Sequence, residues 1–408
     1  MLRNNRSESV RVLHVTAVGE TAALLVAPLA RDQVARGYSV EFACAPSPVT
    51  RVLRNEGMLV HPVPFSRKLL DWRHLLAFVS LVRLMRSRSY DVVHAHTPIA
   101  ALLARFAAYT ASVPVVIYHL RGTFWDSPSR LVRALYTAAE WLAGRMTTHV
   151  FSINCLDREE VVRRGIVRAD RVTCLHAGGA GLDVEKFSPD AVSPGETARL
   201  RRQLAIESGD FVVGFIGRMV RAKGVLDLVA AFERVVAVHP HARLLLVGST
   251  LDSDRDAGLE EEIRRQVARA KLTKRIVFAG FRNEIAGLLS LMDVVVLPSY
   301  REGFGMVIAE AMAMSRPVIA TATRGAREIV ADGITGLLVP VGDRDALAAA
   351  IERLCSDPRL RHQLRRAGRS SVVEHHGMAR VTAEIEDVYA RLLAEQPLGR
   401  SVPKPAVA

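Results

Sequence analysis

The chain has 408 residues, half of them hydrophobic, and a formal net charge of +13 at pH 7. This length exceeds what one compact core supports and fits two globular domains of about 200 residues each. Since no apolar run approaches the roughly 18 residues of a transmembrane helix, we expect no bilayer-spanning segment. Nucleic acid is not an expected partner either, because no recognised binding motif accompanies the positive charge.

Short apolar strands alternate with helical segments along the chain, which predicts parallel α/β sheets in both halves. The first half contains six expected strands, at residues 10–16, 39–43, 91–94, 114–118, 149–152 and 171–175. The second half contains six more, at residues 211–216, 242–247, 275–279, 293–297, 317–320 and 337–339. A polar stretch rich in Pro and Ser after Phe187 is the expected hinge. Because ligands of such sheets collect at the carboxyl ends of strands, two facing domains would form an interdomain cleft.

Compartment is predicted from the cysteines and the first residues. Cys44, Cys155, Cys174 and Cys355 are scattered without metal-type spacing, and we expect reduced thiols in a cytosolic protein. The first twelve residues are polar and charged and show no secretory signal, so the expected localisation is cytoplasmic.

Residues 65–90 mix cationic side chains with leucines and Trp72. The pattern fits a basic amphipathic helix that contacts an anionic membrane, which would make the protein peripheral on the inner face of the plasma membrane. It fits equally an ordinary surface helix with a stripe that faces the core. Both interpretations stay open.

The most specific pattern begins at Glu302, after the strand at residues 293–297. A loop of Gly303, Phe304 and Gly305 leads into an Ala- and Met-rich helix that carries Glu310. Glycines let the backbone approach a ligand, and the free N–H groups of a helix start suit a phosphate or a sugar hydroxyl. Either glutamate alone could be an ordinary surface residue. Their combination with the glycine loop predicts a binding site in which the two carboxylates bind different hydroxyl pairs of one ligand.

A second pattern follows the strand at residues 211–216. Gly217 ends this strand, and Arg218 and Lys223 provide two cations that can converge on a diphosphate. Such contacts strengthen when negative charge grows on a leaving diphosphate. Arg221 is expected to be exposed. A basic loop can also be a solvated turn, but the spacing favours a function.

These motifs resemble the retaining glycosyltransferases of family 4, in their exopolysaccharide and capsule branch. The resemblance rests on Glu302 and Glu310, on the segments that begin at Arg316, Gly325 and Gly333, and on residues 93–99 in the first half. It implies the GT-B fold, an α/β architecture of two Rossmann-like parallel-sheet domains facing an interdomain cleft. The implied divisions are an acceptor-binding domain (1–190), a nucleotide-sugar-binding domain (191–377), a helix returning to the first domain (378–395) and a disordered tail (396–408).

The resemblance also implies roles for the motif residues. Arg218 and Lys223 would contact the donor diphosphate, Glu302 the hydroxyls of the transferred sugar, and Glu310 the ribose. Backbone groups of the loop residues Gly303, Phe304 and Gly305 would support sugar and phosphate. The base would lie near Phe281 and Arg282, held mainly by backbone atoms.

The first half departs from the family pattern at two places. A His-Gly pair is common where this chain has Arg121 before Gly122, with His119 two residues earlier, so both His119 and Arg121 are candidates for the residue beside the transferred sugar. A Gly-Gly pair is common where this chain has only Gly19 to approach the donor phosphate. His96 is a candidate for acceptor contact, and His94 is expected to be structural.

The implied activity is metal-independent transfer, with retention, of a hexose or N-acetylhexosamine from a nucleotide-diphosphate sugar, UDP-linked, to a lipid-linked or growing polysaccharide. No cofactor is expected besides this donor substrate. The leaving phosphate would take the acceptor proton, so Glu302 and Glu310 are not interpreted as an acid/base pair. Asp252 and Asp254 are spaced like a metal clamp but are assigned to solvent. Two alternatives stay open: a nucleotide-sugar epimerase of the same fold, and a non-catalytic nucleotide-sugar-binding subunit.

Overall fold

The computed structural model describes residues 9–66, 71–121, 129–175, 181–250, 256 and 258–395. Gly122, Asp252, Asp254 and the predicted tail lie outside the described residues. The chain divides into two compact units, one formed by Met1–Gly181 with Met378–Ala408 and the other by Leu182–Gly377. The division therefore falls after Gly181, whereas the sequence analysis places it after residue 190.

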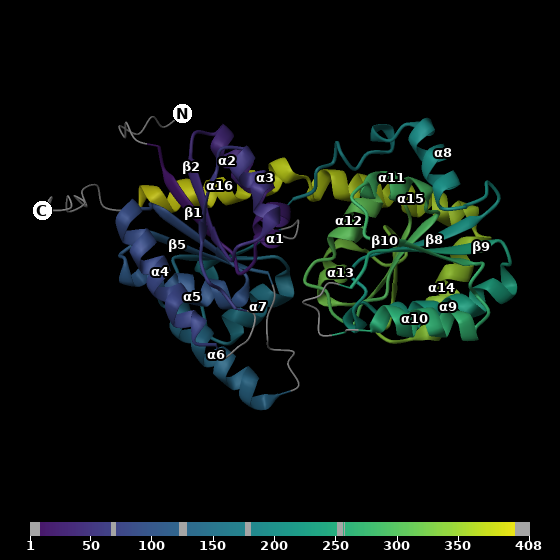
Figure 1. Ribbon diagram of the computed structural model, residues 1–408, viewed down its shortest axis with the longest axis horizontal. Helices are drawn as coiled ribbons and strands as arrows, with labels where there is room; N and C mark the ends of the chain where they lie inside the picture. The colour runs from purple at the N-terminus through teal and green to yellow at the C-terminus, as the bar shows by residue number, and fades with distance from the viewer. Residues whose placement is uncertain are drawn as a thin grey trace, which may run out of the picture. The chain divides into compact units, whose positions relative to one another are not determined.

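The first unit is built on a seven-stranded parallel sheet with the order β3-β2-β1-β4-β5-β6-β7 (Figure 1). Its strands are β1 (Arg11–Val15), β2 (Ser39–Cys44), β3 (Leu59–Pro62), β4 (Val92–His96), β5 (Val115–Leu120), β6 (His149–Ser152) and β7 (Val172–Cys174). The six predicted strands lie within two residues of these bounds. The sequence analysis missed β3, because this edge strand keeps all four residues at least partly exposed and lacks an apolar run.

Helices cover both faces of this sheet (Figure 1). On one face lie α2 (Ala27–Ala35), α3 (Arg51–Asn55) and α16 (Met378–Ala394), and on the other α4 (Arg73–Arg88), α5 (Pro98–Thr110), α6 (Arg130–Gly144) and α7 (Cys155–Arg163). A short helix α1 (Gly19–Thr21) and a π-helical turn (Ala22–Val26) precede α2. The α16 helix fills the core over β1, β2 and β5 with Val381, Ile385, Val388, Tyr389 and Leu392.

The second unit repeats the plan with a six-stranded parallel sheet of order β10-β9-β8-β11-β12-β13. Its strands are β8 (Phe211–Ile216), β9 (Ala242–Val247), β10 (Ile276–Gly280), β11 (Val294–Leu297), β12 (Val318–Thr321) and β13 (Leu337–Val339), each within one residue of prediction. Figure 1 shows α9 (Val225–Val238), α10 (Leu259–Arg269) and α14 (Arg344–Ser356) on one side of the sheet. The other side carries α8 (Pro194–Gln203), α11 (Ile285–Leu291), α12 (Met306–Ala313) and α15 (Pro358–His375), and α13 (Arg324–Ile329) lies between β12 and β13 in the chain.

The expectation of four reduced cysteines is wrong for two of them. Cys155, at the start of α7, and Cys174, at the end of β7, form a disulfide. Their Cα atoms lie 5.5 Å apart, within the range that a disulfide requires. The parallel sheet brings together residues that are 19 positions apart in sequence, and no spacing rule predicts this. Cys44 and Cys355 are free thiols, as expected.

The helix predicted within residues 65–90 is α4, and its burial is split along its length. Ala77, Leu81 and Met85 face the core, as the ordinary surface helix requires. Near its start, Trp72 and Leu75 are 73% and 68% exposed. None of the helices in the described ranges has the length and apolar character needed to cross a bilayer.

A buried ion pair joins α5 to α6. The Arg105 guanidinium donates hydrogen bonds of 2.8 and 2.9 Å to the two Glu140 carboxylate oxygens and lies over the Tyr118 ring. Both charged side chains are almost completely shielded from solvent. Removal of one partner would leave the other charge buried without compensation.

We therefore expect Arg105→Ala to destabilise the first unit by about 3–5 kcal/mol in urea unfolding followed by circular dichroism. A double variant, Arg105→Met with Glu140→Leu, removes both charges and should recover most of this loss. Equal destabilisation by the single and double variants would show that loss of the ion pair itself, rather than an uncompensated buried charge, causes the effect.

Candidate functional site

The residues of the second unit that the sequence predicts to bind a ligand lie together where the strand order of its sheet reverses. Strands β8 and β11, which are not consecutive in the chain, lie side by side at the centre of the sheet, with β9 and β12 on opposite sides of them. Loops that leave the carboxyl ends of two such strands diverge and form the usual ligand site of an open α/β sheet. The β8 loop carries Gly217, Arg218 and Lys223, and the β11 loop carries Glu302.

These two loops touch through their backbones. Gly224 has a φ of +68°, and a Cβ at this position would lie 2.0 Å from the Pro298 carbonyl oxygen. Only glycine fits this combination of left-handed backbone and close approach. Beside it, the Tyr300 N–H donates a 2.8 Å hydrogen bond to the Ala222 carbonyl. The relative positions of the two loops are therefore fixed by backbone rather than by flexible side chains.

Across this junction, Lys223 Nζ forms an ion pair with Glu302 Oε1. The Ser299 hydroxyl donates to the same oxygen at 3.0 Å. Because the lysine and glutamate side chains are only 22% and 12% exposed, the pair is largely shielded from water. Two residues that the sequence assigned to different parts of one ligand thus contact each other directly. Ser299, which is completely buried, was not singled out by the sequence analysis.

Two helices begin at this junction without a side-chain cap. The N-cap residues of α9 and α12 are Gly224 and Gly305, both in the left-handed region, and no described side chain accepts a hydrogen bond from either first turn. In contrast, Asp343 caps α14 and Asp357 caps α15. Backbone N–H groups at an uncapped helix start are available to an anion.

The glycine loop before α12 is packed tightly on its inner side. The Phe304 side chain is 5% exposed and meets the His376 ring edge-on at 5.7 Å. A Cβ on Gly325 would lie 2.5 Å from Phe304 backbone atoms, and the Gly325 N–H donates to the Glu302 carbonyl at 3.2 Å. The Phe304 ring therefore anchors the loop, and any ligand contact would come from backbone atoms of Gly303 to Gly305.

Glu310 is the fifth residue of α12 and is partly buried. No described residue hydrogen-bonds to its carboxylate, and Lys186 supplies the attraction that opposes the loss of hydration. Burial is the larger effect and raises the pKa of Glu310 to about 7. A carboxylate that accepts no hydrogen bond from the described residues is suited to accept hydrogen bonds from ligand hydroxyls.

The remaining predicted residues of this unit occupy the same edge or its margin. Arg218 is exposed on the turn after β8, and a Cβ on Gly248 would lie 1.9 Å from the Gly217 carbonyl oxygen, so these turns are in contact. Arg221 is exposed, as expected, and bonds to Glu262 at 2.5 Å. Arg282 forms an ion pair with Glu284, so its guanidinium is occupied by protein, while the neighbouring Phe281 is 68% exposed.

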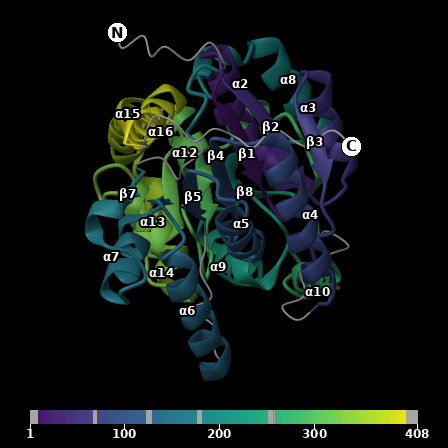
Figure 2. The ribbon, with the colours of Figure 1, turned by 90° about the vertical axis from the view of Figure 1, so that its left-hand side faces the viewer.

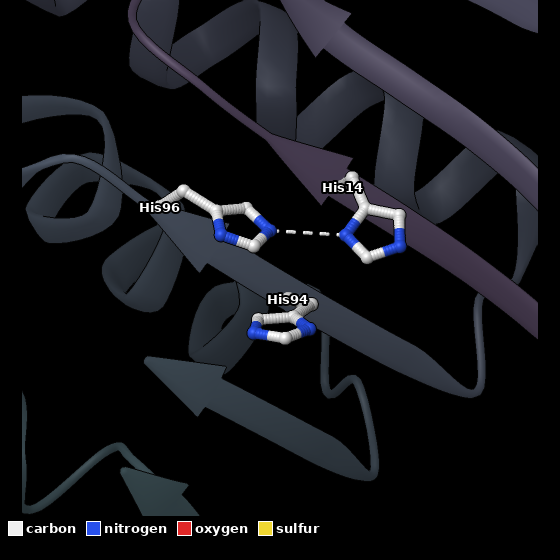
Figure 3. A group of neighbouring side chains, drawn as sticks. All are labelled: His14, His94 and His96. Atoms are coloured by element: carbon white, nitrogen blue, oxygen red, sulfur yellow. Dashed lines mark hydrogen bonds between the residues drawn. The ribbon is translucent and has the colours of Figure 1, made fainter. Parts of the chain in front are cut away.

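In the first unit, the predicted histidines join a buried cluster. His94, His96 and His119 are each 0% exposed. His94 and His96 meet His14 from β1, which the sequence analysis did not single out (Figure 3). The His119 ring packs against His94 and His96. Burial is the main cause that lowers the pKa of all four rings, that of His14 to about 4. The cluster is therefore neutral at physiological pH. His94 is structural, as expected, because its Nδ1 bonds to the Tyr389 hydroxyl at 2.8 Å.

One proton arrangement satisfies the main hydrogen-bond chain. Arg121 Nε donates to His96 Nδ1 at 3.4 Å, so the His96 proton must lie on Nε2, facing His14 Nδ1 at 3.0 Å. His14 then donates from Nε2 to Gln33 Oε1 at 2.8 Å, and Gln33 donates to Glu386 at 3.2 Å. This chain holds Arg121 through a neutral acceptor rather than through a carboxylate.

The rings of His14, His94 and His96 have nitrogen atoms within 4.8 Å of one another, a spacing compatible with a metal ion. However, the facing nitrogens of His14 and His96 share a hydrogen bond, and the His94 ring stacks on His96 with centroids 4.3 Å apart (Figure 3). Stacked rings do not direct their lone pairs to one point, as tetrahedral coordination requires. The geometry fits a hydrogen-bonded cluster better than a set of metal ligands.

His119 and Arg121, the two candidates for contact with the transferred sugar, differ in accessibility. His119 Nδ1 faces His94 Nε2 at 3.1 Å, and its Nε2 is buried with no hydrogen-bond partner in the described ranges. Arg121 follows the last residue of β5 and is partly exposed at the carboxyl edge of the sheet. Its pKa is lowered by burial to about 10, so it stays a cation.

The loops at the strand reversal of the first unit are also joined. The Ala17 N–H donates to Thr97 Oγ1 at 3.1 Å, and Thr97 has a φ of +66°, a strained value for a β-branched residue. Gly19 is buried, and a Cβ on it would lie 2.6 Å from both Ser47 and Thr50. The glycine is thus explained by packing at the start of α1.

Comparison with known proteins identifies relatives for both units. Residues 21–178 match the glycosyl transferase 4-like domain, and residues 196–371 match the glycosyl transferases group 1. The putative glycosyltransferase EpsD of Bacillus subtilis is 31% identical over 346 residues, which cover 83% of this chain and 87% of EpsD. The capsular polysaccharide biosynthesis glycosyltransferase CapM of Staphylococcus aureus is 25% identical, over 94% of this chain and 98% of CapM.

Two further similarities concern ligands and fold. The Escherichia coli UDP-Gal:alpha-D-GlcNAc-diphosphoundecaprenol alpha-1,3-galactosyltransferase is 25% identical over 88% of this chain and 90% of its own. The structure of Anabaena HepE in complex with UDP and glucose superposes with a TM-score of 0.81 at 24% identity, covering 94% of this chain and all of HepE. At this identity the structural match establishes the fold.

The raised pKa of Glu310 predicts a pH-dependent stability difference. The folded state keeps the proton up to about pH 7, whereas the unfolded chain releases it near 4.5, so raising the pH between these values favours unfolding. Relative to Glu310→Gln, the wild type should lose on the order of 2 kcal/mol of stability between pH 4.5 and 7.5. Urea unfolding of both proteins at these pH values tests this, and a difference that does not change with pH would contradict it.

Proposed function

Because this chain belongs to the family 4 glycosyltransferases, in the branch that makes capsules and exopolysaccharides, we propose that it moves a hexose or N-acetylhexosamine from a UDP-sugar to a lipid-linked or growing polysaccharide. Transfer would proceed with retention, without a metal ion and without a cofactor besides the donor. The protein would act in the cytoplasm, at the inner face of the plasma membrane. The observation that carries the proposal is the Lys223–Glu302 pair at the reversal of the second sheet.

The donor and acceptor classes draw support from the relatives. The name of the Escherichia coli relative specifies a UDP-sugar donor and a diphosphoundecaprenol-linked acceptor, and HepE was solved with UDP and glucose. The second unit of this chain offers the chemistry that such a donor needs: cations, two uncapped helix starts and two carboxylates.

Binding of the donor would exchange partners at Lys223. A diphosphate placed at the starts of α9 and α12 would attract the ammonium group away from Glu302, because it offers more negative charge. Glu302 would then accept hydrogen bonds from sugar hydroxyls, still held by Ser299. Arg218, exposed on the same loop, would add a second cation. These contacts would strengthen as the bond to the anomeric carbon breaks and charge accumulates on the leaving diphosphate.

The Glu310 carboxylate would accept hydrogen bonds from the two ribose hydroxyls. Neither Glu302 nor Glu310 is needed as an acid or base, because the leaving phosphate can take the acceptor proton. The donor should bind more tightly as the pH rises through about 7, where the Glu310 carboxyl group loses its proton. A sugar nucleotide carries no phosphate that titrates in this range, so this dependence would report on the protein.

For the first unit, the geometry favours Arg121 over His119 as the group that meets a substrate. Arg121 is partly exposed at the carboxyl edge, while His119 is enclosed by the ring cluster. A cation at this edge suits the diphosphate of a lipid-linked acceptor or the departing phosphate. His96 would act as a positioning residue, because it bonds to Arg121.

Two residues in one turn provide a matched test of the diphosphate site. We expect Lys223→Ala to lower kcat/KM by at least about 100-fold, the usual effect of removing a charge-stabilising donor. Arg221→Ala, two positions earlier but exposed and paired with Glu262, should stay within about threefold of wild type. Release of UDP from a UDP-sugar in the presence of acceptor measures both, with circular dichroism as the folding control. Wild-type rates in Lys223→Ala would refute the assignment.

Product analysis separates the proposal from its alternatives. Proton NMR should show an α-linked product from an α-linked donor, with rates unchanged by EDTA. Turnover of the donor without acceptor, accompanied by inversion at one ring carbon, would instead identify an epimerase. Donor binding without any turnover would identify a binding subunit.

A further inference from the structure

The α6 helix presents an unusual outward surface. Leu131, Leu135 and Leu142 are 68%, 59% and 44% exposed, and Trp141 is 44% exposed. With 3.6 residues per turn, Leu131, Leu135, Ala138 and Leu142 lie in one line along the helix, with Ala134 and Trp141 beside it. We refer to these six residues as the α6 apolar stripe. Such a stripe normally faces a core, but here it faces outward.

The opposite side of α6 already has its packing partners. Glu140 is buried against Arg105, Ala143 and Gly144 are buried, and Tyr136 packs on the core of the first unit. These residues lie on the side of the helix opposite Leu131 and Leu135. The N-terminal turns extend away from the sheet of the first unit in both views (Figure 1, Figure 2). The packing of α6 on the first unit therefore does not require the α6 apolar stripe.

The charged residues that α6 and its C-cap place beside the stripe are arginines. Arg130 and Arg133 lie along its margin near the start of the helix, and Arg145 follows the last turn with its guanidinium over the Trp141 ring. The sole acidic residue of α6 is Glu140, whose charge is neutralised in the interior. Apolar side chains bordered by arginines, with no exposed carboxylate on the helix, are typical of helices that lie in a lipid interface.

We propose that α6 docks the protein on an anionic lipid bilayer, with the α6 apolar stripe inserted among acyl chains and the flanking arginines at headgroup phosphates. Trp141 suits this depth, since indole rings favour the boundary between headgroups and hydrocarbon. The docking does not depend on which sugar is moved. It gives a structural basis for the peripheral localisation proposed above and assigns the main contact to a segment outside residues 65–90.

A second exposed apolar group lies at the start of another helix of the unit. Trp72 and Leu75, at the start of α4, are 73% and 68% exposed, and α5 packs against both α4 and α6. Helices that follow strands of a parallel sheet begin at its carboxyl edge, so the starts of α4 and α6 share that edge with Arg121. A bilayer could contact both helices at once. The arginines beside the stripe favour an anionic bilayer as the occupant.

Vesicle sedimentation of the full chain tests the proposal. The wild type should bind vesicles that contain phosphatidylglycerol more tightly than vesicles of phosphatidylcholine alone. Leu131→Ser with Leu135→Ser should lower the partition coefficient by at least about tenfold, because two side chains lose their apolar contact with lipid. The matched control is Val238→Ser with Ile334→Ser, two side chains of the second unit that are each 63% exposed, and it should bind as the wild type does.

The arginines are tested separately. Arg130→Gln with Arg133→Gln should remove most of the preference for phosphatidylglycerol while leaving the residual binding to phosphatidylcholine unchanged.

Equal losses in the leucine variant and its control, or no binding by the wild type, would overturn the proposal. So would a wild-type dimer in size-exclusion chromatography that the leucine variant dissociates, since the stripe would then be an interface between copies. Thermal shift by a UDP-sugar, expected in every variant, shows separately whether the proposed donor site is correct.

Discussion

The close approach of Gly224 to the Pro298 carbonyl fixes the geometry of the second unit at its functional edge. It joins two loops that belong to neighbouring strands but are more than seventy residues apart in sequence. Once the backbones are in contact, Lys223 and Glu302 reach each other, and the helices α9 and α12 both begin beside them. A larger residue at position 224 would separate the cation from the carboxylate and change every contact made there.

The two units differ in how their shielded polar side chains are stabilised. At the edge of the second unit, the Lys223 ammonium and the Glu302 carboxylate form an ion pair. In the first unit, four imidazoles are packed together with no carboxylate of the described residues bonded to them, and they stay neutral because burial disfavours their protonation. Two of them, His14 and His96, form a hydrogen-bond chain that leads to Arg121, so an uncharged support holds this cation at the carboxyl edge. Support of this kind favours precise placement of a functional group.

Much of this architecture could be predicted from local sequence. Twelve apolar runs gave strands to within two residues, and the glycine loop before Glu310 correctly predicted a strand, loop and helix start. Features that depend on strand order could not be found in this way. His14, His94 and His119 lie on three different strands, and their contact follows only when β1, β4 and β5 are known to be neighbours. The Cys155–Cys174 disulfide and the Lys223–Glu302 contact have the same origin, and β3 was missed because it is an exposed edge strand.

The C-terminal helix α16 has a consequence for how this protein is made. It completes the core of the first unit, where Tyr389 bonds to His94 and Val381 and Ile385 cover the sheet. These residues leave the ribosome only after the whole second unit has been synthesised. During translation the core of the first unit therefore stays incomplete until α16 has been synthesised. A chain that stalls before residue 378 would expose that apolar surface to chaperones and proteases.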